Sequence, residues 1–176
     1  MNINNLSNIR VILLAGELYQ RMIKLSEIIY YTVDKATQDF NYNEFFPADF
    51  KHKREMTLSK IFSLFQTYPM MAHRRVIVIR EFDNIEEYSR TKICELLRKT
   101  PETSLVIVEG LNAELSPEPC SDYFMPVVFP NIQKGDMPNW IKDKFLTRGK
   151  TINDNAIAVL IENIVFVLSR LETVID

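Results

Sequence analysis

Short runs of apolar residues recur along the first 130 residues of the chain. They occupy positions 11–14, 76–79, 104–108 and 125–129, and the run at 76–79 consists of four β-branched residues. Continuous apolar runs of this length are typical of strands that are buried on both faces of a parallel sheet. The pattern therefore predicts four core strands, and a weaker alternation at 39–46, stopped by Pro47, predicts a short additional strand that a loop follows.

Between these runs, apolar residues recur at helical spacing and predict helices at 18–31, from Thr57 to before Pro69, and at 85–98. Thr57 is expected to cap the second helix, which ends before Pro69 because a residue that precedes proline avoids the helical region. The residues expected to face the sheet are Leu18, Met22, Leu25 and Ile29 in the first helix, Leu58, Ile61, Phe62 and Phe65 in the second, and Tyr88, Ile93 or Cys94, and Leu97 in the third. Strands that alternate with helices indicate an α/β fold, with a parallel sheet covered by helices on both faces.

From Asp136 onward the pattern indicates helices only. Asp136 is expected to cap a helix with Pro138 in its first turn and Gly149 at its end, and a second helix is expected from Asn153. Apolar residues between 157 and 174 extend this helical pattern towards the end of the chain. The sequence thus predicts an α/β domain over 1–130 and a small all-helical domain over 131–176.

Composition excludes some classes of function. The net charge of -2 provides no overall positive field that would attract nucleic acid or an anionic membrane. Cys94 and Cys120 form no CxxC pair, so no metal site is expected from them. No run approaches the roughly 18 apolar residues that span a bilayer, and a cytoplasmic protein without membrane contact is expected.

The turn after the first strand tests for nucleotide binding, because phosphate loops lie between such a strand and its helix. A loop of the form GxxxxGK[ST] needs a second glycine, a lysine and a hydroxyl. Here Gly16 is followed by Glu17-Leu18-Tyr19-Gln20-Arg21, and Glu17 would repel an anion. We expect no nucleotide cofactor and no ATP hydrolysis by this chain.

Other candidates for chemistry are weak. The only two histidines, His52 and His73, are not spaced as metal ligands, and no GxSxG elbow occurs, so no catalytic residue and no metal ligand is assigned. Glu81 and Asp83 follow a strand and could imitate the acidic side of a magnesium site, although solvated loop carboxylates explain them as well.

Basic and aromatic residues leave further alternatives open. The cluster 51–54, expected in a loop, could contact a phosphate backbone or simply form a solvated surface. Arg74 and Arg75 could orient the methionine-containing turn that precedes them or pair with Glu81, and Trp140 is expected to anchor a core between the two domains.

The order of these segments resembles one known family, the delta subunit of the bacterial DNA polymerase III clamp loader. The resemblance rests on a strand with a Gly-Glu turn, on Tyr-Pro-Met-Met-Ala-His-Arg-Arg at 68–75 before an apolar strand, and on Pro-Glu-Thr-Ser-Leu-Val-Ile at 101–107. A third block, formed by Trp140, Ile141, Gly149, Ile152, Ala156 and Leu160, is similar to the small helical lid domain of the family. Two departures are the segment 111–115, which replaces a basic stretch, and Arg170 with Thr173 in the last helix.

The resemblance implies an AAA+-like (RecA-like) fold that has lost its nucleotide site, and a C-terminal collar domain that is absent here. It further implies that Met70 and Met71 insert into a hydrophobic pocket of the beta sliding clamp, with Arg74 as a further candidate contact. Two flexible thioethers suit an irregular pocket. The residues taken alone favour an arrangement in which both methionines pack beneath the turn as core, and only the resemblance favours the clamp contact.

The function implied by the resemblance is to bind the sliding clamp and help open it for loading onto primed DNA during replication, without intrinsic activity. The implied partners are gamma/tau and delta-prime type subunits, within a DNA-directed DNA polymerase (nucleotidyltransferase) holoenzyme that contacts DNA. Two alternatives of other classes remain. One is a degenerate P-loop NTPase that uses Glu81 or Asp83 with a metal, and the other is a nucleic-acid-binding module that acts through 51–54.

Overall fold

The computed structural model describes residue 6 and residues 8–111, 124–129 and 135–163. The chain divides into two compact units, Met1–Phe129 and Pro130–Asp176. The first unit carries an α/β sheet structure, and the described part of the second unit consists of helices. Cys120 and the helix expected over 165–174 lie outside the described residues.

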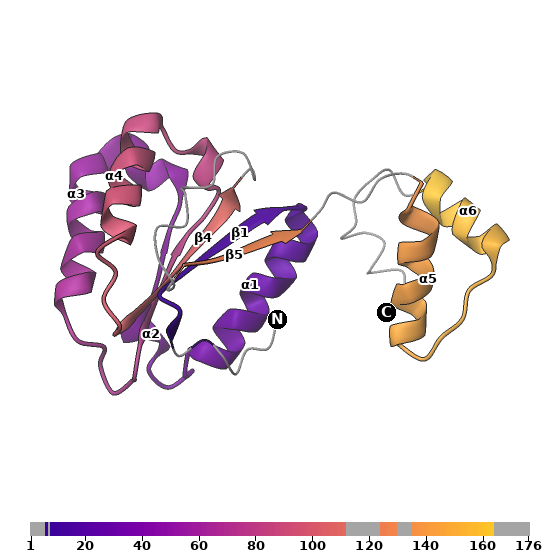
Figure 1. The fold of residues 1–176 in the computed structure, drawn as a ribbon, viewed down its shortest axis with the longest axis horizontal. Helices are drawn as coiled ribbons and strands as arrows, with labels where there is room; N and C mark the ends of the chain where they lie inside the picture. The colour runs from indigo at the N-terminus through magenta and orange to yellow at the C-terminus, as the bar shows by residue number, and fades with distance from the viewer. Residues whose placement is uncertain (1–5, 7, 112–123, 130–134, 164–176) are drawn as a thin grey trace. The chain divides into compact units, whose positions relative to one another are not determined.

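The first unit is built on a five-stranded sheet of order β2-β3-β4-β1-β5 in which every neighbouring pair is parallel (Figure 1). The strands are β1 (Val11–Gly16), β2 (Tyr42–Phe45), β3 (Arg75–Ile79), β4 (Ser104–Leu111) and β5 (Phe124–Phe129). All four core strands expected from apolar runs are present, and the α/β fold class is confirmed.

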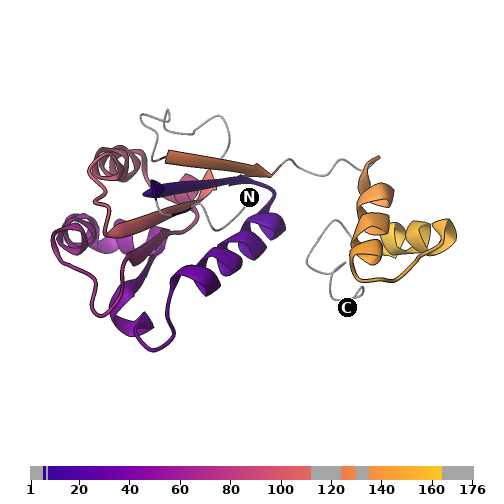
Figure 2. The same cartoon turned by 60° about the horizontal axis from the view of Figure 1, so that its bottom comes forward.

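Helices cover both faces of this sheet, as the alternation of elements predicts. Helix α1 lies on one face, and α3 and α4 lie side by side on the other (Figures 1 and 2). The helices of this unit are α1 (Leu18–Thr32), α2 (Gln38–Asn41), α3 (Pro47–Gln66) and α4 (Glu87–Leu97), with a 3-10 helix η2 (Phe82–Asn84). Because neighbouring strands are parallel, each helical connection carries the chain from the carboxyl end of one strand back to the amino end of the next.

Successive side chains of each strand point to opposite faces of the sheet, and they form one hydrophobic core on each face. In β1, Val11 and Leu13 pack in the core beneath α3 and α4, whereas Ile12 and Leu14 pack in the core beneath α1. All four side chains are at most 1% exposed. Because successive strand residues point to opposite faces, a continuous apolar run serves both cores, which explains why the sequence shows no polar alternation there.

The inward face of α1 differs from the predicted one. Leu18 is 59% and Met22 is 38% exposed, whereas Leu25 and Ile28 are buried. Arg21 completes the inward row at the start of the helix, where its side chain forms an ion pair with a buried carboxylate. The prediction was wrong for the first two positions because a charged residue occupies the place that an apolar residue was expected to take.

The segment before β3 also contains more helix than predicted. The chain forms α2 where a strand was expected to start, and only Tyr42–Phe45 is extended. Helix α3 begins at Pro47 instead of Thr57, and a non-helical residue at Lys53 kinks it. The basic cluster 51–54 therefore lies in a helix and not in the predicted loop.

Local hydrogen bonds explain the early start of α3. The Asp49 carboxylate accepts from the backbone N–H of Phe46 at 2.8 Å, which stabilises the helix start in the manner of a capping box. Thr57 is not a cap, because its hydroxyl donates across the kink to the Asp49 carbonyl at 3.0 Å. Polar residues at 48–56 gave no apolar periodicity, so this first part of the helix was missed.

Helix α4 starts at Glu87 and buries Ile93 and Leu97, as expected. Tyr88 was expected to face inward and is 49% exposed instead. Its ring lies 4.6 Å from the Arg54 guanidinium, which is a cation–π contact that links α4 to α3. Phe62 on α3, also expected inward, is 45% exposed.

The described part of the second unit contains α5 (Met137–Thr147) and α6 (Asp154–Asn163). Gly149 has a φ of 69°, the left-handed conformation expected after a helix end. Asp136 precedes α5 without a side-chain capping bond, whereas the Asn153 side chain accepts from the N–H of Ala156 at 2.8 Å before α6. Trp140 is partly exposed in α5, and its role as an anchor between domains stays a prediction.

None of the helices that the structure describes combines the length and the apolar character needed to cross a bilayer.

A buried ion bridge holds α1, β3 and β4 together at the carboxyl edge of the sheet. Glu109 on β4 is 1% exposed, and its carboxylate pairs with Arg21 on α1 and, at 3.4 Å, with Arg80 at the end of β3. The same carboxylate accepts from the backbone N–H of Glu81 at 3.1 Å. A buried carboxylate is stable only with such partners, so this bridge fixes the relative positions of three elements.

We predict that Glu109→Ala lowers the free energy of unfolding by about 3 kcal/mol, because it leaves the largely buried Arg21 guanidinium without its counter-charge. It also removes one of the two carboxylates that pair with Arg80, the other being Glu44. Urea denaturation measures this change. Glu102→Ala is the matched control, because Glu102 forms an ion pair with Arg10 at 2.5 Å but its side chain is 82% exposed. The control should lose less than about 1 kcal/mol. Equal losses in the two variants would contradict a special role for the buried bridge.

Candidate functional site

Two turns at opposite edges of the sheet are the candidates for function. The turn after β1 lies at the carboxyl edge of the parallel sheet, and the turn before β3 lies at the amino edge. The first is the position at which α/β proteins bind phosphate. The second contains Met70 and Met71.

The turn after β1 is closed by the backbone of β5. Gly16 has a φ of 91°, and a Cβ at this position would lie 1.8 Å from the carbonyl oxygen of Phe129. The next N–H, that of Glu17, donates to the same carbonyl at 2.9 Å. Glycine is therefore required here for the close approach of another strand, and not for the approach of a phosphate.

The N-terminus of α1 is capped by a carboxylate of its own chain. The two oxygens of Glu17 accept from the backbone N–H groups of Tyr19 at 3.0 Å and Gln20 at 2.8 Å. These amides are the donors that a phosphate would use at a helix N-terminus. A phosphate group would have to displace the Glu17 carboxylate, which repels it, so the geometry disfavours a nucleotide at this turn.

Glu81 and Asp83 lie close to this edge. Glu81 adopts a left-handed φ of 48°, and its carboxylate accepts from the Asn84 side-chain amide at 3.0 Å. Over the residues described, no group of three or more His, Cys, Asp or Glu side chains is placed to hold a metal ion. Glu81 and Asp83, which could have imitated a magnesium site, thus belong to no such group of three ligands in this part of the chain.

The methionine turn, residues 68–73, presents apolar side chains to solvent. Tyr68 and Met71 are each 86% exposed, and Met70 is 51% exposed. The alternative in which both methionines pack as core is therefore wrong. Met71 also has a left-handed φ of 52°, which is strained for a residue with a side chain and is typical of positions that the surrounding structure enforces.

Asn41 fixes the backbone of this turn. Its side-chain amide donates to the Met70 carbonyl at 2.6 Å and accepts from the Met70 N–H at 2.8 Å. Asn41 is 2% exposed, and it also donates to the carbonyl of Thr37 at 3.2 Å. These two bonds between one buried amide and the N–H and carbonyl of a single residue hold Met70 in one position relative to α2.

Arg75 supports the turn from the side of α3. Its buried guanidinium donates to the carbonyls of Leu64 at 2.6 Å, Thr67 at 3.0 Å and Tyr68 at 3.3 Å, and to the Thr67 hydroxyl at 2.7 Å. These carbonyls belong to the end of α3, where helical partners are lacking. Burial lowers the pKa of Arg75, although arginine stays charged in proteins. Arg75 thus orients the turn, which is one of the two roles expected for it.

Arg74 supports the turn from the side of the sheet. Its guanidinium donates to the carbonyls of Leu6 at 2.8 Å, Ile9 at 2.5 Å and Ser104 at 2.8 Å. Burial lowers its pKa, and the nearby Arg10 charge adds to this effect. The side chain therefore points into the protein and joins the chain before β1 to β4, and its predicted contact with a partner stays a prediction.

Sequence reasoning missed Asn41 and Glu109. Neither residue belongs to a motif, and their long-range partners lie 28 residues or more away along the chain. The only available signal was a polar residue adjacent to an apolar run, which many surface positions share. Met70 and Met71 were found through the family resemblance and not through their chemistry.

Comparison with solved structures identifies the fold. The chain is similar to the Bacillus subtilis DNA clamp loader delta protein, with a TM-score of 0.62 and 16% identity over 94% of this chain and 51% of that protein. It is also similar to a DNA polymerase III gamma subunit-related protein from Thermotoga maritima, with a TM-score of 0.50 and 16% identity over 81% of this chain and 47% of that protein. No protein-family model matches the sequence, and no curated protein matches it. The chain thus spans about half the length of these two proteins and has the AAA+-like fold of clamp-loader subunits that the sequence predicts.

Proposed function

We propose that this chain is a clamp-loader subunit of the delta type that binds a sliding clamp through Met70 and Met71. The observation that carries the proposal is the methionine turn, in which two exposed thioether side chains project from a strained backbone that buried polar groups hold in place. Ordering costs are reduced when a binding element is fixed before it meets its partner. Similarity to the clamp loader delta protein supports the same conclusion.

The proposed mechanism is binding without chemistry. Each methionine contributes on the order of 1.5 to 3 kcal/mol if it is fully buried in a hydrophobic pocket. A ring-shaped clamp opens only if the subunit binds the open form more tightly than the closed form, because a ligand shifts an equilibrium by its differential affinity. A rigid turn suits this role, since it fits one arrangement of the pocket better than another.

The remaining steps of loading are proposed to depend on other subunits of the complex. The carboxylate of Glu17 occupies the amides that a nucleotide would need, so ATP binding and hydrolysis are assigned to gamma/tau type neighbours. We further propose that delta-prime type subunits and primed DNA join the assembly, as part of a polymerase holoenzyme in the cytoplasm. The domain boundary near residue 130 belongs to the same proposal.

We predict that the double variant Met70→Ala, Met71→Ala weakens binding to the sliding clamp of the same organism by roughly 2 to 4 kcal/mol, or about 30-fold to 1,000-fold. Isothermal titration calorimetry measures the affinity, and circular dichroism checks that the fold is intact. Met56→Ala is the control, because Met56 is 60% exposed on α3 and lies outside the turn. Unchanged affinity of the double variant would refute the proposed contact.

We predict that Asn41→Ala weakens clamp binding by about tenfold, although both methionines remain. Loss of the amide frees the Met70 peptide, so the turn must be ordered during binding at a cost of about 1.4 kcal/mol. Surface plasmon resonance on immobilised clamp provides the comparison. Asn43→Ala is the matched control, because the buried Asn43 side-chain oxygen has no hydrogen-bond partner. Similar affinities for the two variants would show that Asn41 does not preorganise the contact.

We predict that the chain shows no saturable binding of ATP with magnesium at micromolar concentrations in a fluorescence titration. The Glu17→Ala variant should also fail to bind, because the turn still lacks the lysine and hydroxyl of a phosphate loop. Loss of the cap should lower its free energy of unfolding by about 1 kcal/mol. Saturable ATP binding by the natural chain would instead support a degenerate P-loop NTPase.

A further inference from the structure

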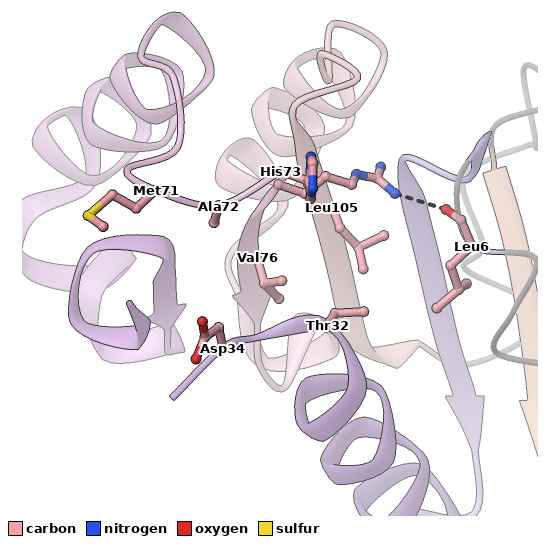
Figure 3. Close-up of a pocket in the computed structure, with 9 residues that line it drawn as sticks. Leu6, Thr32, Asp34, Met71, Ala72, His73, Val76 and Leu105 are labelled. Carbon is pink, nitrogen blue, oxygen red and sulfur yellow. Dashed lines mark hydrogen bonds between the residues drawn. The ribbon is translucent and has the colours of Figure 1, made fainter. Parts of the chain in front are cut away.

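A cavity of about 350 Å³ opens beside the methionine turn, at the amino edge of the sheet. Figure 3 shows Val76 and Leu105, from β3 and β4, directed into the space between the turn and the end of α1, where Thr32 lies. Met71 lies at one end of this group, on the side away from Leu6. Among the described residues, this turn cavity is lined by Leu6, Thr32, Asp34, Met71, Ala72, His73, Arg74, Val76 and Leu105.

The inner surface of the turn cavity is apolar and rigid. Val76 and Leu105 are each 1% exposed and belong to paired strands, and Leu6 is 7% exposed. A cavity of about 150 Å³ can hold a benzene ring. The turn cavity therefore has room for one large aliphatic or aromatic side chain, which would lie next to strand residues that β-pairing holds in place.

Three of the polar residues at the cavity, Thr32, Asp34 and Arg74, are engaged within the protein, whereas His73 is exposed. The Thr32 hydroxyl donates to the Ile28 carbonyl at 2.6 Å, and an Asp34 carboxylate oxygen accepts from the Ala36 N–H at 2.9 Å. The Arg74 guanidinium donates to three backbone carbonyls. An anion would find no uncommitted arginine here and would face the carboxylate of Asp34, and the strand residues behind the cavity are apolar, so an apolar occupant fits best.

One wall of the cavity identifies the source of the occupant. Met71 lines the cavity, and yet 86% of its surface is exposed. A small molecule bound in the cavity would therefore leave most of the Met71 side chain in contact with solvent. A protein that covers Met71 completes this wall and covers the adjacent opening at the same time. Reciprocal insertion of side chains is the usual geometry at the centre of a well-packed interface.

We infer that the protein that receives Met70 and Met71 also inserts one large apolar side chain into the turn cavity. This inference rests on the proposed function, and its occupant is a side chain of the sliding clamp. The contact is then reciprocal, with methionines of the turn in a pocket of the clamp and a clamp residue between the turn and α1. It extends the interface from an exposed turn to the buried residues Val76 and Leu105 of the sheet.

The experiment fills the cavity from the wall opposite the turn. Thr32→Phe adds a ring at the end of α1 without changing the turn, and it should weaken clamp binding by about tenfold. Ser26→Phe is the matched control, because it adds the same ring at an exposed position of α1 outside the cavity, and its affinity should equal that of the natural chain. Methyl NMR of the natural chain bound to the clamp provides a second measurement, in which Val76 and Leu105 methyl groups should show intermolecular NOEs.

The outcomes separate this inference from the proposed function. The reciprocal contact is supported if Thr32→Phe loses affinity and Ser26→Phe does not, and if Val76 and Leu105 show NOEs to clamp protons. If the natural chain binds and the double methionine variant does not, but these NOEs are absent or Thr32→Phe binds normally, the inference is overturned and the proposed function stands. If the natural chain does not bind the clamp, both are overturned.

Discussion

Strand β3 is constrained at both of its ends, and the two candidate edges of the protein depend on this constraint. Met71 before the strand and Glu81 after it both adopt left-handed φ angles, which cost of order 1 to 3 kcal/mol each. Pairing with β2 and β4 fixes the strand between them. Buried polar groups then offset the strain, through Asn41 at the first turn and Glu109 at the second.

The two edges of the sheet differ in what they leave exposed. At the carboxyl edge, Glu17 caps its own helix and Glu109 pairs with two arginines, so charged groups of the chain occupy the places where a nucleotide and its metal bind in related folds. At the amino edge, polar groups are also buried, but they bind backbone and leave Met70 and Met71 in solvent. Charges thus close the carboxyl edge, whereas the amino edge presents apolar side chains, which supports the proposed binding role.

Local signals allowed much of the fold to be predicted from the sequence. Apolar runs such as 76–79 identify strands because burial on both faces requires them. Helix α3 was mislocated because its first half is polar and is stabilised by Asp49 and by packing that only the folded chain provides. Arg21 was not among the residues expected to face the sheet, since its burial depends on a carboxylate 88 residues away. Asn41 was missed for the same reason, because a long-range hydrogen bond leaves no periodic pattern.

The site illustrates how a polar core can define an apolar surface. Methionine is flexible, and two exposed methionines on a mobile loop would lose conformational entropy on binding. Here the backbone beneath them is held from α2 by Asn41, from α3 by Arg75 and from the sheet by Arg74, so only the side chains remain to be ordered. Adaptable thioethers on a fixed backbone can fill an irregular pocket while the backbone sets the distance and angle of approach. Under the proposed function, in which the chain binds the open and the closed clamp with different affinity, we infer that this fixed geometry is the source of the difference.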